Sequence, residues 1–591
     1  MTKKYFTRLL QASLMCCMAV LFAACDDFFG NESNPTPAYL SMSDKPVTIK
    51  VGETFLRQAT STSTAVIEYS SSDTNVATVD NSGLVTGVAD GEATITATAT
   101  GYSSKTGTKI YLPDSKSYKV TVGGGSVVPP GPTPGPAALA TPLTMEAITA
   151  GTIVVTSPQA GMQYSLNGGA KTAVTTDAIT VAVGDKVQFY GKGTAIAKYS
   201  GTKIKDGTAE VKVYGNIMSL VDETDFATNK KLTVAETFKS LFINNDKLKD
   251  ASGLLLPAET LTDYCYRNMF YGCTSLTTAP AELPATDLAE YCYSDMFYGC
   301  TKLTAAPELK AEKLADYCYN QMFLGCKALT AAPALPATSL AKYCYSSMFL
   351  NCTSLTAAPA LPATSLAEGC CSAMFYGCTK LTAAPAELPA TSLAKSCYSN
   401  MFLGCTSLTT APALPAETLA EYCYSGMFQD CTKLTAAPAL PATTLAEECY
   451  YYMFNNCTAL TAAPAKLPAT SLAEKCYSYM FFDCKDLTVA PALPATSLAE
   501  NCYDSMFQGC TSLTATPKLP AETLEIGCYS HMFSGCTALT TAYVKAAYND
   551  YMYMFGGCTA TGATLHTTND HKASWDGKMG TNWTVDNNWT D

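Results

Sequence analysis

The feature that most restricts the fold of this 591-residue chain is a phrase that returns every 26 or 27 residues between Tyr264 and Gly557. One copy reads CYSSMFLNCTSLTAAPALPATSLAEG, residues 344–369. A period of this length, with Leu, Cys and Phe at fixed places, is typical of a solenoid, because one copy cannot bury its apolar side without a neighbour. The last interval shortens to 22 residues. The second cysteine of each copy marks the period: Cys273, Cys300, Cys326, Cys352, Cys378, Cys405, Cys431, Cys457, Cys484, Cys510, Cys536 and Cys558.

The first half of each copy is predicted to form about two turns of helix. Leu340, Cys344 and Met348 stand four residues apart, as the residues of one apolar helical stripe do. Residues that recur in every copy are expected to face the core. The pairs that follow Cys-Tyr vary from copy to copy, as in Ser294-Asp295, and are expected to face water.

The second half of each copy is predicted to form a short strand and a turn. Leu355 and Ala358 would point to one side of this strand and Thr356 to the other. Pro359 would end the ladder, because proline has no N–H to donate. The additional residue of the 27-residue copies always enters at one place, as at Ala281-Glu282, so this place is predicted to be a loop.

The phrase CTSLTTAPALPAETLAEYCYSGMFQDC, residues 405–431, resembles the leucine-rich repeat of BspA-like surface proteins. The resemblance covers roughly residues 216–591, and Phe349, Cys352 and Leu355 match the pattern residue by residue, as does Pro362 in the Leu-Pro turn. It implies a non-enzymatic protein that binds host or bacterial macromolecules.

Two β-rich regions precede the repeats. The stretch YSSSDTNVATVDNSGLVTGVADGEATITATA resembles the group 2 bacterial Ig-like domain, and its alternating apolar runs are typical of half-buried strands. The predicted fold is therefore multidomain, with one or more N-terminal all-β Ig-like domains followed by a leucine-rich-repeat solenoid of short parallel strands and short helices. The predicted regions are: signal peptide 1–24, tether 25–38, Ig-like domain 39–122, Pro/Gly linker 123–141, small β-rich domain 142–215, N-terminal cap 216–262, repeats 263–558 and C-terminal cap 559–591.

The N-terminus has the pattern of a cleaved export signal. Three basic residues precede the apolar stretch 9–22, and Ala23-Ala24-Cys25 follows. This resembles the lipobox of bacterial lipoproteins, which implies that Cys25 is acylated and anchors the chain in a membrane. The alternative is an ordinary signal peptide with a chance cysteine. Asp26-Asp27 resembles a surface-export signal, so we expect an outer-membrane lipid anchor that faces the exterior, with the inner leaflet as the alternative.

Composition excludes one class of partner. The chain carries a formal net charge of −12, and its only arginines are Arg8, Arg57 and Arg267. No basic face for a nucleic acid can be assembled from these residues, so no nucleic-acid partner is expected.

Most of the 27 cysteines lie in the repeats. If the two cysteines of a copy were separated by eight helical residues, they would stand about 12 Å apart, beyond the reach of about 7 Å that a disulfide allows. Bonds between adjacent copies stay open, but a buried thiol packs as a small hydrophobe, and free buried thiols are favoured. The same separation makes a shared zinc ion a poor alternative, and no metal or other cofactor is predicted.

Two rows of recurring polar residues are candidates for binding. A tyrosine follows the first cysteine in ten copies, and its simplest interpretation is a half-buried filler between helices. A threonine follows the strand leucine in eleven copies, from Thr277 to Thr540, and its simplest interpretation is strand propensity on a solvated face. The alternative is that the threonines line a surface for a protein or glycan. The candidate binding face comprises Thr277, Thr304, Thr330, Thr356, Thr382, Thr409, Thr435, Thr461, Thr488, Thr514 and Thr540.

No cluster of unlike residues predicts catalysis. His566 and His571 of the HTTNDH stretch could suggest a metal site, but a solvated loop is the favoured interpretation. We therefore predict a cell-surface lipoprotein that binds or adheres through its repeats to a host or bacterial surface protein or glycan, and that is not an enzyme. The alternative is a structural or decoy surface protein without a specific ligand.

Overall fold

The structure, a computed structural model, falls into two compact units, Met1–Thr133 and Pro134–Asp591. The predicted signal peptide, the candidate lipid site Cys25 and the tether lie outside the described residues, as do residues 123–135 of the linker. No helix in the described stretches is long and apolar enough to cross a membrane. The structure describes these residues: 40–43, 47–49, 54–61, 65–89, 91–103, 114–122, 136–192, 201–549 and 553–589.

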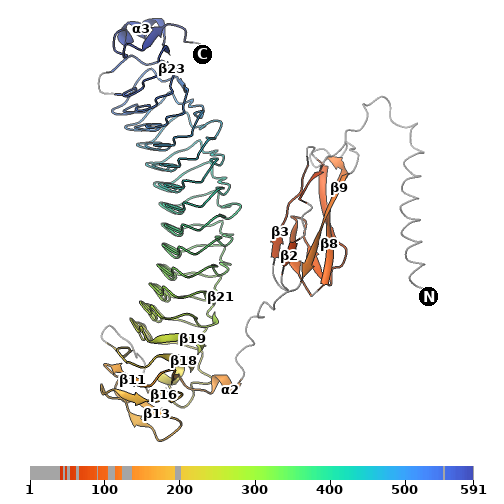
Figure 1. Cartoon of the computed structure of the whole chain (residues 1–591), viewed down its shortest axis with the longest axis vertical. Helices are drawn as coiled ribbons and strands as arrows, with labels where there is room; N and C mark the ends of the chain where they lie inside the picture. The colour runs from red at the N-terminus through yellow and green to blue at the C-terminus, as the bar shows by residue number, and fades with distance from the viewer. Residues whose placement is uncertain are drawn as a thin grey trace, which may run out of the picture. The chain divides into compact units, whose positions relative to one another are not determined.

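The first unit is a small β-structure (Figure 1). Its two larger sheets have the strand orders β2-β9-β8-β5 and β3-β7-β6. Along β8, Ala93, Ile95 and Ala97 are buried and the threonines between them are half-exposed, which confirms the predicted alternation. The strands are β1 Leu40–Ser41, β2 Val47–Ile49, β3 Thr54–Leu56, β4 Thr60–Ser61, β5 Ala65–Ser71, β6 Ala77–Val79, β7 Leu84–Gly87, β8 Gly91–Ser103 and β9 Asp114–Val122.

One glycine of this unit is required by its turn. Gly83 has φ of +86°, and a Cβ there would lie 2.6 Å from the carbonyl oxygen of Arg57. Only glycine meets both conditions, because it has no Cβ and adopts positive φ freely.

The second unit begins with a β-rich region that leads directly into the repeats. Its main sheet has the order β14-β13-β16-β10-β18-β19. The elements are α2 Pro136–Leu139, β10 Thr144–Ala147, β11 Gly151–Ile153, β12 Val155–Thr156, β13 Gln163–Leu166, β14 Thr172–Ala173, β15 Ile179–Val181, β16 Lys186–Tyr190, β17 Lys203–Ile204, β18 Val211–Asn216, the 3-10 helix η2 Ile217–Leu220 and β19 Leu248–Leu255.

The β-rich region and the repeats share one hydrophobic core. Strand β18 pairs in parallel with β19, and Asp250 of β19 pairs in turn with Thr278 of the first repeat. Buried side chains from Leu143 to Trp575 form a single contiguous cluster. The structure thus joins the two stretches that the sequence analysis separates at residue 215.

The repeats contain no helix in the described stretch 221–549, so the predicted helical turns are wrong. Each copy instead forms a coil, and its turn segment, residues 343–352 in one copy, is a series of tight turns. Within the segment, the N–H of Met348 donates to the carbonyl of Tyr345 at 3.2 Å, and the N–H of Phe349 donates to Met374 of the next coil at 2.9 Å. Local bonds and bonds between coils alternate in this way along the segment.

The four-residue spacing that suggested a helix comes from the backbone of these turns. Tyr343, Ser347 and Asn351 have φ of 50°, 53° and 60°, so every fourth residue is left-handed. The last of these positions precedes the second cysteine, and it is Gly, Asn or Asp in every copy, the residues that tolerate this conformation best. They are Gly272, Gly299, Gly325, Asn351, Gly377, Gly404, Asp430, Asn456, Asp483, Gly509, Gly535 and Gly557.

Strand pairing between coils is parallel and short. A sheet of more than two strands forms only at the C-terminal end of the described repeats. In mid-array it consists of single bridges such as Ala357 with Ala383, whereas β22 to β25 form a four-stranded sheet. The indole N–H of Trp575, which is buried, donates to Ala546 at 2.9 Å and attaches α3 to the last coils. The remaining elements are β20 Glu282–Leu283, β21 Glu308–Leu309, β22 Ala515–Leu519, β23 Thr541–Val544, β24 Ala563–His566, α3 Asn569–Trp575 and β25 Trp583–Asp586.

Columns of identical side chains fill the core (Figure 1 shows the stacked coils). Phe349 stacks on Phe323 and on Phe375, with ring centroids 5.5 Å apart in both pairs. Such aromatic pairs add stabilisation beyond the area that they bury.

The described cysteines, all in the repeats, are buried and free. In one example, the thiol of Cys378 donates to the carbonyl of Phe349 in the preceding coil at 3.1 Å. Burial raises the pKa of Cys378 to about 12, which keeps the thiol protonated and able to donate. The segment between the two cysteines of a copy is not helical, so the predicted helical separation of about 12 Å does not apply. The favoured prediction of free buried thiols agrees with the structure.

Candidate binding surface

All eleven threonines of the candidate face are exposed. Several of their hydroxyls donate along the array to a carbonyl of the preceding coil. The hydroxyl of Thr382 donates to the carbonyl of Thr356 at 3.1 Å, and that of Thr461 donates to Thr435 at 3.2 Å. The N–H of Thr382 donates to the same carbonyl at 3.0 Å.

These bonds determine which donor and acceptor groups of the threonine row remain available to a ligand. A hydroxyl has one proton to donate and two lone pairs that accept. Because the proton of Thr382 is directed to Thr356, its lone pairs and its methyl group remain for the solvent side. Six of the eleven threonine hydroxyls donate to the preceding coil in this way. Every hydroxyl of the row can still accept a hydrogen bond, which suits a ligand that donates hydrogen bonds, such as a sugar hydroxyl or a peptide N–H.

The residues beside the row vary in charge. Lys302, Lys380 and Asp486, each two residues before a row threonine, are exposed, whereas Ser275 and Ser354 at the same position are half-buried. The candidate face thus has the same residue, threonine, in every coil of the row, whereas the residue two positions before it changes in charge from coil to coil.

The tyrosines that follow the first cysteine are fully buried, so the half-buried position expected for them is wrong. Tyr293 and Tyr319 are 0% and 1% exposed, and their ring centroids lie 5.7 Å apart. Several of their hydroxyls have no hydrogen-bond partner among the described residues. Leaving a buried hydroxyl unpaired costs about 1–3 kcal/mol. This column faces the core and is no surface for a ligand.

A second tyrosine ladder lies nearer the surface, one residue before the first cysteine. Tyr264, Tyr291, Tyr317 and Tyr343 are half-buried, and successive ring centroids lie 4.8, 4.5 and 5.1 Å apart. This ladder is not among the predicted features, although a tyrosine stands at the same place in four successive copies of the sequence. Because the rings cover one another, they present edges and hydroxyls rather than open faces.

The varying pairs after Cys-Tyr do not all face water, which corrects the expectation for them. Ser294 and Asp295 are 0% and 8% exposed. The guanidinium Nε of Arg267 lies 3.5 Å from the Asp295 carboxylate, but burial outweighs this charge and raises the pKa of Asp295. These residues lie in the turn segment of their coil, where a side chain packs against the same segment of the adjacent coil, as Asp295 does against Arg267.

The histidines of the HTTNDH stretch are not in a solvated loop. His566 belongs to β24 and His571 to α3. The Nδ1 atom of His566 lies 2.8 Å from the Asp586 carboxylate, and that of His571 lies 2.6 Å from the carbonyl oxygen of Lys545. Across the described residues, no group of three or more His, Cys, Asp or Glu side chains could hold a metal ion.

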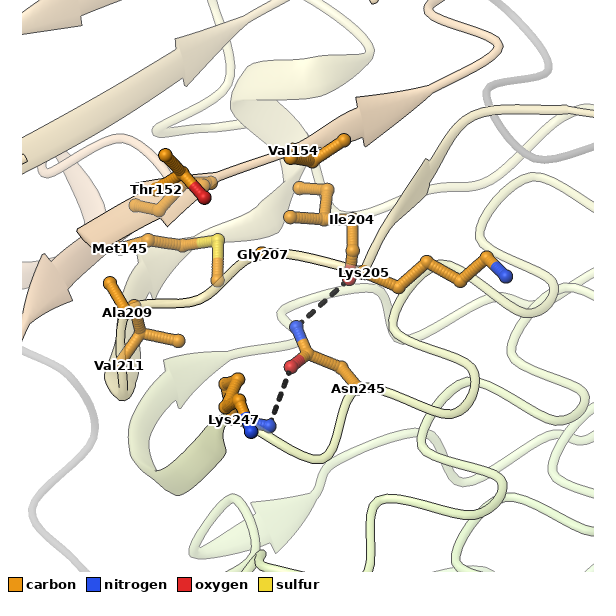
Figure 2. Close-up of a pocket in the computed structure, with 11 residues that line it drawn as sticks. Met145, Thr152, Val154, Ile204, Lys205, Gly207, Ala209, Val211, Asn245 and Lys247 are labelled. Carbon is orange, nitrogen blue, oxygen red and sulfur yellow. Dashed lines mark hydrogen bonds between the residues drawn. The ribbon is translucent and has the colours of Figure 1, made fainter. Parts of the chain in front are cut away.

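A small pocket lies where the β-rich region meets the first coil (Figure 2). Met145, Ile204 and Val211 form its apolar wall, and Asn245 lies at its edge. The Asn245 amide donates to the carbonyl of Ile204 at 3.0 Å and accepts from the N–H of Lys247 at 3.0 Å. The pocket holds a space of about 10 Å³, enough for about one water molecule. Asn245 stands where later coils have the second cysteine, so this pocket is a structural junction rather than a ligand site.

Comparison with known families identifies both parts of the chain. A model of the group 2 bacterial Ig-like domain matches residues 40–109. A model described as the BspA type leucine-rich repeat region, with six copies, matches residues 263–381, 367–488 and 447–570, together more than half of the chain. Neither is a catalytic family.

Comparison with individual proteins adds little. No curated protein matches the chain. A leucine-rich repeat protein from Bacteroides ovatus is 18% identical over 56% of this chain and 88% of its own, with a TM-score of 0.29. One from Eubacterium ventriosum is 14% identical over 59% of this chain and 91% of its own, also with a TM-score of 0.29.

Proposed function

The chain belongs to the BspA-type leucine-rich-repeat family, and from this premise we propose that it is a non-enzymatic binding protein of the cell surface whose solenoid attaches it to a macromolecule. The observation that carries the proposal is the exposed threonine row, which repeats once per coil along a single continuous core. Repeat arrays use such extended surfaces for binding. An adhesive function, with a host or bacterial protein or glycan as the partner, is the specific form that we propose.

Because the threonine hydroxyls of the row can accept hydrogen bonds, ligands that carry many hydrogen-bond donors are favoured as partners. A sugar chain or an extended peptide that runs along the array can donate one hydrogen bond to each coil. The contribution of each contact is small, and affinity comes from their number along the row.

We expect three lysines on the threonine face to weaken capture of the ligand at least tenfold. The variant Thr356→Lys, Thr382→Lys, Thr409→Lys places long charged side chains on three successive coils, where they obstruct a ligand that lies along the row. The measurement is a titration of the purified unlipidated chain against immobilised matrix proteins, mucins and glycans.

The matched control carries the same three charges on the same coils but on another exposed line: Ser365→Lys, Ser392→Lys and Thr418→Lys. Equal capture by the two variants would place the site elsewhere. If the unsubstituted chain captured nothing, the alternative of a structural or decoy protein would be favoured. The hydrogen bonds from threonine hydroxyls to the preceding coil agree with that alternative too.

We also propose that Cys25 carries the acyl anchor that holds the chain at the outer membrane, facing the exterior. The export pattern before Cys25 and the acidic pair after it support this placement. We expect a radiolabelled fatty acid to enter the unsubstituted chain and not Cys25→Ser, which should move to the soluble fraction. Retention of the label by Cys25→Ser would exclude this attachment site.

A further inference from the structure

An aromatic cluster on the turn segments lies apart from the threonine row, and the binding proposal does not use it. It consists of Tyr451, Tyr452, Tyr479 and Phe482, all half-buried. Tyr452 and Tyr479 occupy the same left-handed position of adjacent coils, with φ of 56° in both, and their rings stack with centroids 4.6 Å apart. Solvent reaches this cluster in part, unlike the fully buried tyrosine column.

One face of the Tyr452 ring has no ring over it. On the side away from Tyr479, the same position of the preceding coil is Gly426, which has φ of +60° and no side chain. The Tyr451 centroid lies 4.3 Å from that of Tyr452 and 6.0 Å from that of Tyr479. A ring over the free face would lie farther from Tyr479, at about the sum of the 4.3 and 4.6 Å steps, so Tyr451 stands beside the edge of Tyr452.

Two amide side chains border the space at Gly426. A Cβ at Gly426 would lie 2.2 Å from Oδ1 of Asn400 and 3.6 Å from Oε1 of Gln429. An amide supplies two N–H donors and one oxygen acceptor. An aromatic face and groups that both donate and accept hydrogen bonds therefore lie on two sides of a position without a side chain.

Two carboxylates of the surrounding coils already have partners. Glu448 forms an ion pair with Lys475 at 3.5 Å, and Asp430 accepts a hydrogen bond from the Asn456 amide at 2.7 Å. Because these carboxylates are engaged, the surface suits a neutral ligand better than a cation.

From this geometry we propose that the free face of Tyr452, with the amides of Asn400 and Gln429, is a second binding site that takes one neutral sugar ring. The C–H groups of the sugar lie against the negative face of the aromatic ring. Its hydroxyls exchange hydrogen bonds with the two amides. Small-molecule sites commonly combine aromatic side chains with a few polar groups in this way.

Saturation-transfer NMR on the unlipidated chain tests the site, with the methyl glycosides of glucose, galactose, mannose and N-acetylglucosamine as probes. We expect a saturable signal from at least one probe, strongest at the C–H protons of one ring face. The three-lysine variant of the threonine row should keep this signal, so the two binding proposals succeed or fail separately. A chain that gives no saturable signal with any of the four, or that binds choline in their place, overturns the proposal.

Two variants locate the sugar. Tyr452→Ala removes the aromatic face and should weaken binding roughly tenfold, as expected for the loss of a strong aromatic contact. Gly426→Asn should weaken it as much while all the rings remain. Asparagine tolerates the left-handed backbone, and its side chain fills the space and displaces only the flexible end of Asn400.

The matched control is Tyr298→Ala. Tyr298 is also a half-buried tyrosine of the turn segments and stacks on Tyr271 with centroids 4.5 Å apart, so its loss should leave the affinity for the sugar unchanged. Undiminished binding by Tyr452→Ala or by Gly426→Asn would show that the sugar binds elsewhere. An equal loss in the control would contradict the site too.

Discussion

A chain that begins at Asn216 will aggregate or remain unfolded, whereas a chain that begins at Pro134 will fold. The first cut follows the boundary that the sequence suggests, and the second follows the compact unit. The cut at Asn216 removes nearly all of β18, on which β19 and the first coil are built.

Three backbone bonds show how closely the β-rich region is joined to the cap. Gly191 donates to Ser219 at 2.9 Å, Ile204 donates to Leu241 at 2.7 Å and Val211 donates to Lys247 at 3.0 Å. The shorter chain lacks all three donors, so the carbonyl groups of Ser219, Leu241 and Lys247 lose these partners.

The loss of apolar contact is larger still. Each buried aliphatic side chain such as Met145 or Val213 contributes about 1.5–3 kcal/mol, and removing several of them approaches the whole stability of a domain, about 5–15 kcal/mol. Size-exclusion chromatography and urea unfolding measure the outcome. A monodisperse Asn216 fragment with a cooperative transition would contradict it.

The second large effect is expected from Phe349→Ala. The ring is 0% exposed and stacks on Phe323 and Phe375 in the two adjacent coils. We expect a loss of about 3–5 kcal/mol, the usual range for emptying a buried aromatic site. Because each coil contacts only its neighbours, unfolding of the array should separate into two transitions at this coil.

Thr356→Ala is the matched control in the same coil. Its side chain is exposed, and its hydroxyl reaches the carbonyl of Thr330 only at 3.5 Å, so we expect a change within about 0.5 kcal/mol. Thermal and urea melts of the two variants check the pair. Equal stabilities would show that the phenylalanine column does not hold the coils together.

The repeats show what periodicity can and cannot predict. Recurrence of Cys344, Met348 and Phe349 correctly indicated buried side chains, all 0% exposed. The same spacing gave the wrong backbone, because a helix and a series of turns with a left-handed residue at every fourth place both return a side chain to the core after four residues. The Gly, Asn or Asp before each second cysteine was the signal that separates the two structures.

Variation between copies was a weaker guide to exposure. Ser294 and Asp295 vary and are buried, because side chains at turn corners pack against adjacent coils rather than into water. The fusion of the β-rich region with the repeats could not be predicted either, since it depends on parallel pairing of β18 with β19 across about 30 intervening residues. The exposed threonine row was predictable from strand alternation, but the direction of its hydroxyl protons required the structure.

The bonds between coils also determine how the array responds to tension. Each coil is held by hydrogen bonds to its neighbours along the stack, as between Phe349 and Met374, so a pull on the C-terminal end loads these bonds one coil after another. A coil of 26 residues occupies about 5 Å of the stack and releases about 90 Å of chain when it peels away. We therefore expect the array to lengthen in steps under load. Because each step releases chain, it lowers the force on a ligand bound to the array.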